Sequence, residues 1–252
     1  GNELLVLGVP PAPAMGAATS ECQAAWLPEE LFDDIAVVPC LPDPRVSEDY
    51  KYKKFVSRSH PDKLAFDLNS IGYYGSDLWQ SKAKIDAAWL KSSGVLSHKI
   101  TELSCRGLVV NAPTMQIIVE ECPNLEILDL TRAGPGVNKA VAHLTSLENL
   151  QYINFSNSFV DELGLSYLPQ CRSLRSVRLA AGARLTDASL EHLACCPVLR
   201  HLDLSGNAAL TEEGLRLLLK SASLETICLR GLAVQGVENF TTMAQLRDLF
   251  IF

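Results

Sequence analysis

A repeat of about 25 residues constrains this chain more than any other feature. Each copy places three apolar residues in the spacing L-x-x-L-x-L, most clearly at Leu125, Leu128 and Leu130. The seven copies begin at Ile100, Leu125, Leu150, Leu174, Leu199, Leu224 and Leu246. Successive starts lie 25, 25, 24, 25, 25 and 22 residues apart, so the register holds across the whole second half of the chain. One unit of this size cannot bury its own apolar side, and the period therefore predicts a stacked array.

Each copy has the pattern of a short strand followed by a helix. Leu202 and Leu204 alternate with polar neighbours, which is the period of a strand. Farther on, Thr211 is a suitable helix N-cap, and the apolar residues behind it at helical spacing are Leu215, Leu218 and Leu219. We therefore expect residues 95–252 to form an α/β solenoid of about seven strand–helix repeats. A parallel sheet should form its inner face, with the helices outside.

The repeat resembles the leucine-rich repeat in its cysteine-containing subclass. Cys122, Cys171 and Cys196 each lie three residues before the first repeat leucine, where this subclass tends to place its cysteine. Asn207 stands at the family's asparagine-ladder position. The other copies depart from the family pattern there, with Leu108, Ala133, Ser158, Gly182 and Leu232. The resemblance therefore implies an uneven set of turns rather than a regular asparagine ladder.

Residues 1–94 show no repeat, and we expect an irregular, partly helical extension that also covers the first repeat. This region holds eight of the 13 prolines and all three tryptophans. Short helices are predicted within 27–38 and over 76–93. The second helix should cover the open end of the solenoid, which repeat arrays require. The side chains expected to make that contact are Leu78, Ile85, Ala88 and Trp89.

Composition and motifs exclude several classes of function. The formal charge is -7, whereas nucleic acids and anionic membranes call for a basic face. No apolar run reaches the roughly 18 residues of a membrane span. The eight cysteines form no CxxC pair and no zinc-type cluster, so we expect packed, reduced thiols and no metal or cofactor.

Catalytic motifs such as G-x-S-x-G, the P-loop and HExxH do not occur in the sequence. A small-molecule substrate is therefore not expected, and we predict a protein without enzymatic activity. The enzymatic alternative would use His201 and Asp203 as an acid–base pair. It predicts a deep pocket at rungs four to six.

The best candidate site is the inner face of the sheet, where outward-pointing strand residues should line up in three columns. Mixed polar side chains with a tyrosine and arginines suit a protein interface, and the alternative is a merely solvated face. The predicted partner-binding residues of this concave face are Asp129, Tyr152, Asn154, Arg178, His201, Asp203 and Arg230. Residues near the two ends of the chain complete the prediction: Trp26, Leu27, Leu31, Phe250 and Phe252. The two phenylalanines should not face water.

Two resemblances bear on the kind of partner. YGSDLWQ (74–80) before the first repeat is similar to the layout of the ATP synthase subunit s and distal membrane-arm assembly protein family. This implies an accessory or assembly subunit that binds other subunits of a mitochondrial respiratory-type complex. A first residue other than Met fits a processed organellar chain or a tag remnant, and reduced thiols fit the matrix side as well as the cytoplasm.

The alternative comes from LPEELFDDI (27–35), which resembles the opening of an F-box. Repeats of this subclass often follow an F-box. The resemblance implies a cytoplasmic substrate-recognition subunit of a cullin ubiquitin ligase. HPDK (60–63) matches the tetrapeptide of chaperone J-domains, but little room precedes it for that family's first helix, and we interpret it as a His-Pro turn.

Overall fold

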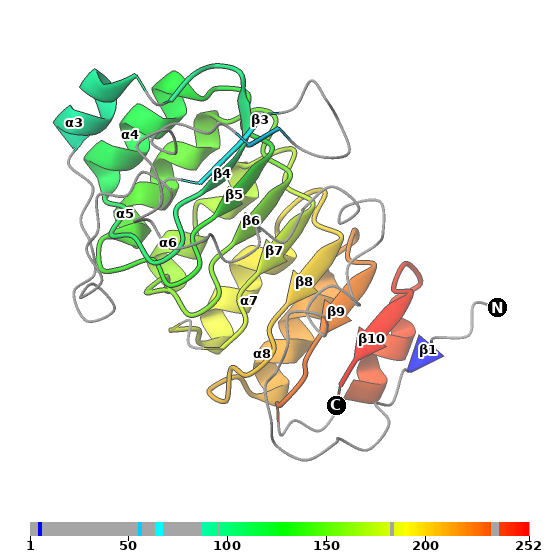
Figure 1. The fold of residues 1–252 in the computed structure, drawn as a ribbon. Coiled ribbons are helices and arrows are strands. Elements are labelled where there is room, and N and C mark those ends of the chain that lie inside the picture. Colours follow the sequence, from blue (N-terminus) through cyan, green and yellow to red (C-terminus); the bar gives the residue numbers. More distant parts are fainter. Residues whose placement is uncertain are drawn as a thin grey trace, which may run out of the picture.

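The computed structural model describes residues 5–6, 55–56, 64–67, 87–94, 96–181, 184–232 and 237–251. All seven predicted repeat strands are present, and Figure 1 shows them side by side in one sheet with the helices along its other side. The strands are β4 (Ile100–Ser104), β5 (Ile127–Asp129), β6 (Tyr152–Asn154), β7 (Ser176–Arg178), β8 (His201–Asp203), β9 (Thr226–Cys228) and β10 (Asp248–Phe250). Each pairs in parallel with the next, which confirms the α/β solenoid.

Short segments from the first third of the chain extend the sheet at both ends. At one end β1 (Leu5–Val6) pairs in parallel with β10. At the other, β3 (Leu64–Asp67) pairs in parallel with β4, and β2 (Phe55–Val56) pairs antiparallel with β3. An unpaired strand edge is a template for association with other chains. The end of the array at β10 therefore has a further strand beside it.

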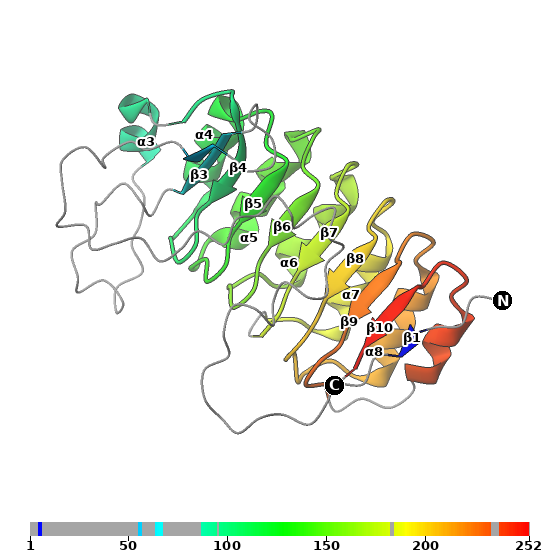
Figure 2. The same cartoon turned by 45° about the vertical axis from the view of Figure 1, so that its right-hand side comes forward.

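Helices connect the strands on the outer side, and the two views agree on this layering (Figure 2). They are short because a 25-residue rung leaves room for only a few helical turns. They are α4 (Ala112–Glu121), α5 (Val137–Val141), η3 (Ala142–Ser146), α6 (Glu162–Leu165), η4 (Leu168–Gln170), α7 (Asp187–Ala194), α8 (Glu212–Leu217), η5 (Leu218–Lys220) and η6 (Val237–Thr242). The predicted cap is confirmed, since Thr211 caps α8, and Thr186 forms a capping box at the equivalent position of α7.

The apolar repeat positions form one continuous core. The first residue of every copy is at most 3% exposed. Cys122, Cys171 and Cys196 are buried in the same core, as free thiols. Burial raises the pKa of Cys171 to about 11 and that of Cys196 to about 12. These thiols therefore stay protonated and pack as small apolar groups, as predicted.

Each of the first six rungs turns through a left-handed residue three positions after its strand. The residues with this positive φ, between 48° and 75°, are Gly107, Arg132, Asn157, Ala181, Gly206 and Gly231. A side chain in this region is strained by contact between its Cβ and the backbone. Three rungs use glycine and avoid that strain, and three accept it because the stacked rungs impose the same path on all six.

The predicted covering helix is present as α3 (Ala87–Ser93), which packs against α4. Its buried contact differs from the prediction. Leu90 is 1% exposed, whereas Ala88 is exposed. Among the described residues of this helix, Leu90 therefore makes the buried contact and Ala88 does not. Leu78, Ile85 and the Trp89 side chain lie outside the described residues.

Several predictions fall on parts of the chain that the structure does not describe. These are the F-box-like segment 27–35, the HPDK tetrapeptide 60–63, the stretch 74–80, and the site residues Trp26, Leu27, Leu31 and Phe252. Within the described residues, no helix combines the length and the apolar character that a bilayer crossing requires.

Candidate protein-binding face

The strand pairing confirms two of the three predicted columns of the concave face; the predicted third column follows the strand ends and comprises Arg106, Thr131, Ser156, Ala180, Ser205, Arg230 and Phe252. The middle column follows the register from strand to strand: Ser104, Asp129, Asn154, Arg178, Asp203, Cys228 and Phe250. A second column runs beside it: Glu102, Ile127, Tyr152, Ser176, His201, Thr226 and Asp248. Equal spacing of the repeats thus brings residues about 25 positions apart in the sequence into contact distance on one face.

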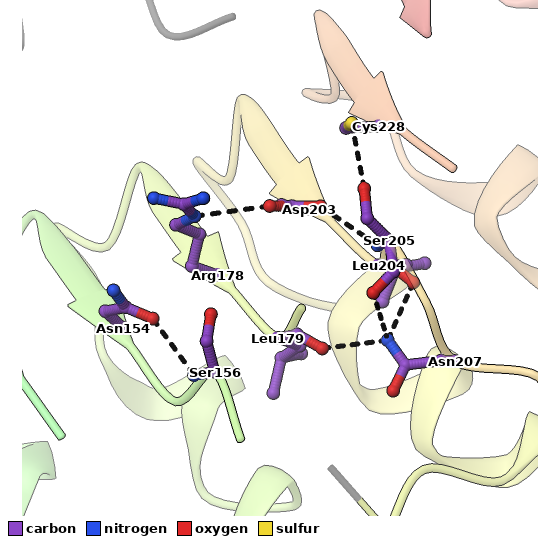
Figure 3. A network of polar contacts seen from close by, with 9 residues as sticks. All are labelled: Asn154, Ser156, Arg178, Leu179, Asp203, Leu204, Ser205, Asn207 and Cys228. Atoms are coloured by element: carbon purple, nitrogen blue, oxygen red, sulfur yellow. Dashed lines mark hydrogen bonds and ion pairs between the residues drawn. The ribbon is translucent and has the colours of Figure 1, made fainter. Parts of the chain in front are cut away.

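Three middle-column residues also build the turns that follow their strands. The Oδ1 atoms of Asp129, Asn154 and Asp203 each accept a hydrogen bond from the backbone N–H two residues later. The distances are 2.8 Å, 2.9 Å and 2.9 Å, and Figure 3 shows the bonds of Asn154 and Asp203. This is the Asx-turn arrangement, in which a short polar side chain satisfies its own backbone. One oxygen of each of these side chains is therefore already used within the fold, to stabilise its own turn.

Asp203 also forms a buried ion pair between two rungs. Its Oδ2 lies 3.2 Å from Nε of Arg178, and the two side chains are 3% and 13% exposed. A buried carboxylate needs such a partner, because burial otherwise strongly penalises its charge. Next to this pair, Ser205 Oγ and Cys228 Sγ lie 3.0 Å apart (Figure 3). The polar groups of rungs four to six thus contact one another across the sheet.

The predicted acid–base pair is not formed. Both oxygens of Asp203 already accept hydrogen bonds, one from the Ser205 N–H and one from Arg178. His201 Nδ1 has no hydrogen-bond partner within the described part of the chain. Burial lowers the pKa of His201, opposed in part by Glu225. The geometry therefore lacks the hydrogen-bonded base and orienting carboxylate that the enzymatic alternative requires.

Tyr152 lies deep in the second column, with 4% of its surface exposed. Burial raises the pKa of Tyr152 to about 12, and the neighbouring Arg178 opposes that rise. The phenol is therefore neutral at physiological pH. It presents a hydroxyl and an aromatic ring rather than a charge.

Some of the buried polar atoms without hydrogen-bond partners belong to the concave columns. They are Thr131 Oγ1, Ser156 Oγ, Ser176 Oγ, His201 Nδ1 and Arg230 Nε, while others among the described residues, such as Ser97 Oγ and Thr101 Oγ1, do not belong to the columns. Such an atom costs about 1–3 kcal/mol when it is left unsatisfied. Our site prediction omitted Thr131, Ser156 and Ser176. The repeat predicts the column to which each of these residues belongs, but it does not predict that their side chains are buried.

The predicted burial of Phe250 is confirmed. Its ring is 9% exposed and lies below the guanidinium of Arg230, with 5.3 Å from Cζ to the ring centroid. This is a cation–π contact, which shields the ring while keeping the charge near solvent. Arg230 is thus held in place by a residue of the last rung.

The predicted site residues therefore fall into two groups on the same face. Tyr152, His201 and Asp203 are buried and form its floor. The partly exposed members are Asp129, Asn154, Arg178 and Arg230. Among the described residues, no group of three or more His, Cys, Asp or Glu is placed to hold a metal ion.

Comparison with known proteins names the repeat unit. The family model described as "Leucine Rich repeat" matches residues 195–219, which contain β8 and α8. One chain of the mouse RP105/MD-1 complex is similar at 19% identity and a TM-score of 0.37, over 61% of this chain and 30% of that one. The chain thus spans less than a third of that structure's chain.

A second solved structure is an internalin (inlF) from Listeria monocytogenes. It is similar at 11% identity and a TM-score of 0.36, over 75% of this chain and 73% of that one. No curated protein sequence matches the chain. The strand order establishes the solenoid, and the family model matches one copy of its repeat, at residues 195–219.

Proposed function

We propose that this protein is a non-enzymatic protein–protein interaction module whose concave face binds another protein subunit. Solenoids expose an extended concave surface of this kind. The observation that carries the proposal is the row of partly exposed polar side chains on that face, Asp129, Asn154, Arg178 and Arg230. Carboxylate, amide and guanidinium groups in a row suit the backbone and polar side chains of a protein, which supply donors and acceptors at short intervals.

The finer proposal is an accessory or assembly subunit of a large mitochondrial respiratory-type complex, on the matrix side. It is supported by the resemblance of the stretch at 74–80 and by the buried, reduced thiols of the core. Free thiols suit a reducing compartment.

The experiment uses a variant that alters the concave face without removing its turns. The exchange D129N/N154D keeps an acceptor oxygen at both positions for the N–H groups of Thr131 and Ser156. It moves a negative charge by one rung and leaves the net charge unchanged. The matched control is the exchange Q116E/E120Q on the outer helix α4, where Gln116 Nε2 now donates to Glu120 Oε1 over 2.9 Å.

The full-length chain and both variants are purified from cells that express it, and co-purifying proteins are quantified by mass spectrometry with particle sizing. We expect respiratory-type subunits in a particle of several hundred kDa. A particle of that size is a multisubunit assembly rather than a complex of two proteins that share one standard interface. The concave exchange D129N/N154D should reduce the amount of co-purifying subunits, and the outer exchange Q116E/E120Q should not. A lone monomer, or equal recovery with both variants, would overturn the binding face. A cullin and its adaptor in equal amounts would replace the respiratory assignment with the ubiquitin-ligase alternative.

A further inference from the structure

A depression lined by arginines lies on a different surface, at the side of the sheet where the N-terminal ends of the strands lie. We call this surface, with Arg172, Arg175 and Arg200, the arginine edge. The depression has a volume of about 360 Å³ and extends over three consecutive rungs. Its cationic lining residues are Arg172, Arg175 and Arg200, and none of the residues lining it is a carboxylate. A positive site of this kind stands out on a chain with 29 acidic and 22 basic residues.

The backbone places two of these arginines in equivalent positions. Arg175 directly precedes β7 and Arg200 directly precedes β8. The N–H of Arg200 donates to the carbonyl of Arg175 over 2.8 Å, and the N–H of Arg175 donates to the carbonyl of Gln151 over the same distance. Arg172 lies three residues before Arg175 on the same rung, and the side chains of Arg175 and Arg200 start from neighbouring strands about 4.8 Å apart. Their origins are fixed by the sheet before any ligand arrives.

Ion pairs within the chain leave part of this charge uncompensated. Arg200 lies 3.3 Å from Glu225, a carboxylate that Arg247 also approaches to 3.7 Å. Arg172 and Arg175 form no ion pair with any described residue. Both side chains are exposed. Two guanidinium groups on one rung are thus available for an anion.

The remaining lining residues indicate the kind of anion. Asn149 and Gln151 offer amide donors and acceptors, which suit a polypeptide backbone. Val198, 37% exposed, adds an apolar contact. Guanidinium groups bind carboxylates through paired hydrogen bonds. The overall charge of -7 disfavours a long polyanion such as a nucleic acid, whose charge extends well beyond the depression.

We propose that this edge is a second interaction surface, which binds a short acidic segment of a protein partner. Carboxylates of the segment contact Arg172 and Arg175, while its backbone lies along Asn149 and Gln151. Three rungs span about 10 Å, the length of roughly three extended residues. This inference shares one assumption with the proposed function, namely that the partner is a protein.

The test uses the full chain and a fluorescein-labelled peptide of six glutamates flanked by glycines, followed by fluorescence anisotropy. The edge variant is R172Q/R175Q. The matched control is K139Q/R216Q, which also removes two exposed cations but on the outer helices α5 and α8. We expect salt-sensitive binding to the unaltered chain, binding about tenfold weaker in the edge variant, and binding within about twofold of the unaltered chain in the control.

Three results would overturn the inference: no binding of the peptide at low salt, equal loss in both variants, or binding at least tenfold tighter to a phosphoserine peptide than to the glutamate peptide. The concave exchange D129N/N154D should bind the peptide as the unaltered chain does. If the concave-face proposal fails, the peptide experiment still tests the arginine edge. If the peptide experiment fails, the concave-face proposal is unaffected.

Discussion

The concave face and the arginine edge both carry polar side chains, but they differ in how far the protein itself uses them. On the concave face, Asp203 is buried and bonded both to Arg178 and to a backbone N–H. On the edge, Arg172 and Arg175 are exposed and form no ion pair within the described residues. The difference teaches that one surface of a repeat array can be part of the structure while a neighbouring surface is free to bind.

The largest effect should come from breaking the buried ion pair. Arg178→Met leaves the Asp203 carboxylate, 2% exposed, without its cation, and we expect a loss of about 3 kcal/mol in the free energy of unfolding. The measurement is urea denaturation. Arg216→Met, which breaks the exposed pair with Glu212, serves as the control and should change stability by less than about 0.5 kcal/mol. Equal effects of the two substitutions would contradict the division between a structural face and exposed charges.

Asn207 should give the next largest effect, because it ties two rungs together beneath the concave face. Its Nδ2 donates to the carbonyls of Leu179 and Leu204 over 2.8 Å and 2.7 Å (Figure 3). Asn207→Ala removes both donors inside a buried turn, and we expect a loss of about 2 kcal/mol. Ser158→Ala, at the equivalent position of an earlier rung, is the comparison and should cost less than half as much. Similar losses would mean that the ladder position contributes by packing alone.

The pH dependence of stability should arise in part from His201, a buried residue of the concave face. Burial holds the pKa of His201 in the folded chain below its unfolded value of about 6.5. The unfolded chain therefore binds the proton more readily, and stability falls as pH drops below about 6.5 until it levels off below the folded pKa. Glu225 and Asp248 act against this shift, and Arg200 and Arg247 act with it. Thermal unfolding from pH 7.5 to 5 should show a smaller loss for His201→Gln than for the unaltered chain, and an equal loss would contradict this origin.

A small gain is expected at one of the strained turns. Ala181 has φ 48°, in the left-handed region, at the position that glycine occupies in three other rungs. Ala181→Gly removes strain of about 1–2 kcal/mol but adds flexibility to the unfolded chain worth about 0.5–1 kcal/mol. The expected net gain is about 0.5 kcal/mol in chemical denaturation. Gly206→Ala, the reverse change one rung later, should destabilise, because its φ is 72° and the added Cβ would lie 3.4 Å from Ala181.

The smallest effect on stability should come from the arginine edge itself. R172Q/R175Q removes two exposed side chains without ion pairs among the described residues, and we expect a change within about 0.5 kcal/mol. Chemical denaturation of the same preparation used for peptide binding is the measurement. A loss above about 1 kcal/mol would show that these arginines belong to the fold rather than to a binding surface.

The concave columns could be predicted because a constant period forces equivalent residues into register. Ser176 and His201 pair across β7 and β8 as the 25-residue spacing requires. Phe250 was predicted not to face water on a different ground, because an exposed large apolar side chain marks a contact, and it is 9% exposed. The last part of the covering helix predicted over 76–93 is confirmed by α3, but Leu90 rather than Ala88 makes its buried contact. A helix seven residues long has too few positions for periodicity to define its face.

The arginine edge was not predicted, because the apolar repeat does not define which residue type stands directly before each strand: Arg175 and Arg200 are equivalent there, but the next copy has Glu225. Arg172 and Arg175 share a rung, and Arg200 joins them only through strand pairing. The pairing of β1 with β10 was likewise beyond sequence reasoning, since two-residue strands carry no periodic signal.

The sequence by itself therefore determined the repeat unit, the parallel order of the seven strands and the membership of the three columns. Periodicity is a local property, and stacking converts it directly into register. Only the tertiary structure decided which column residues are buried, which polar atoms lack partners, and which arginines remain unpaired. Those properties depend on atoms from neighbouring rungs, and hydrogen bonds and ion pairs form only when those rungs are in contact.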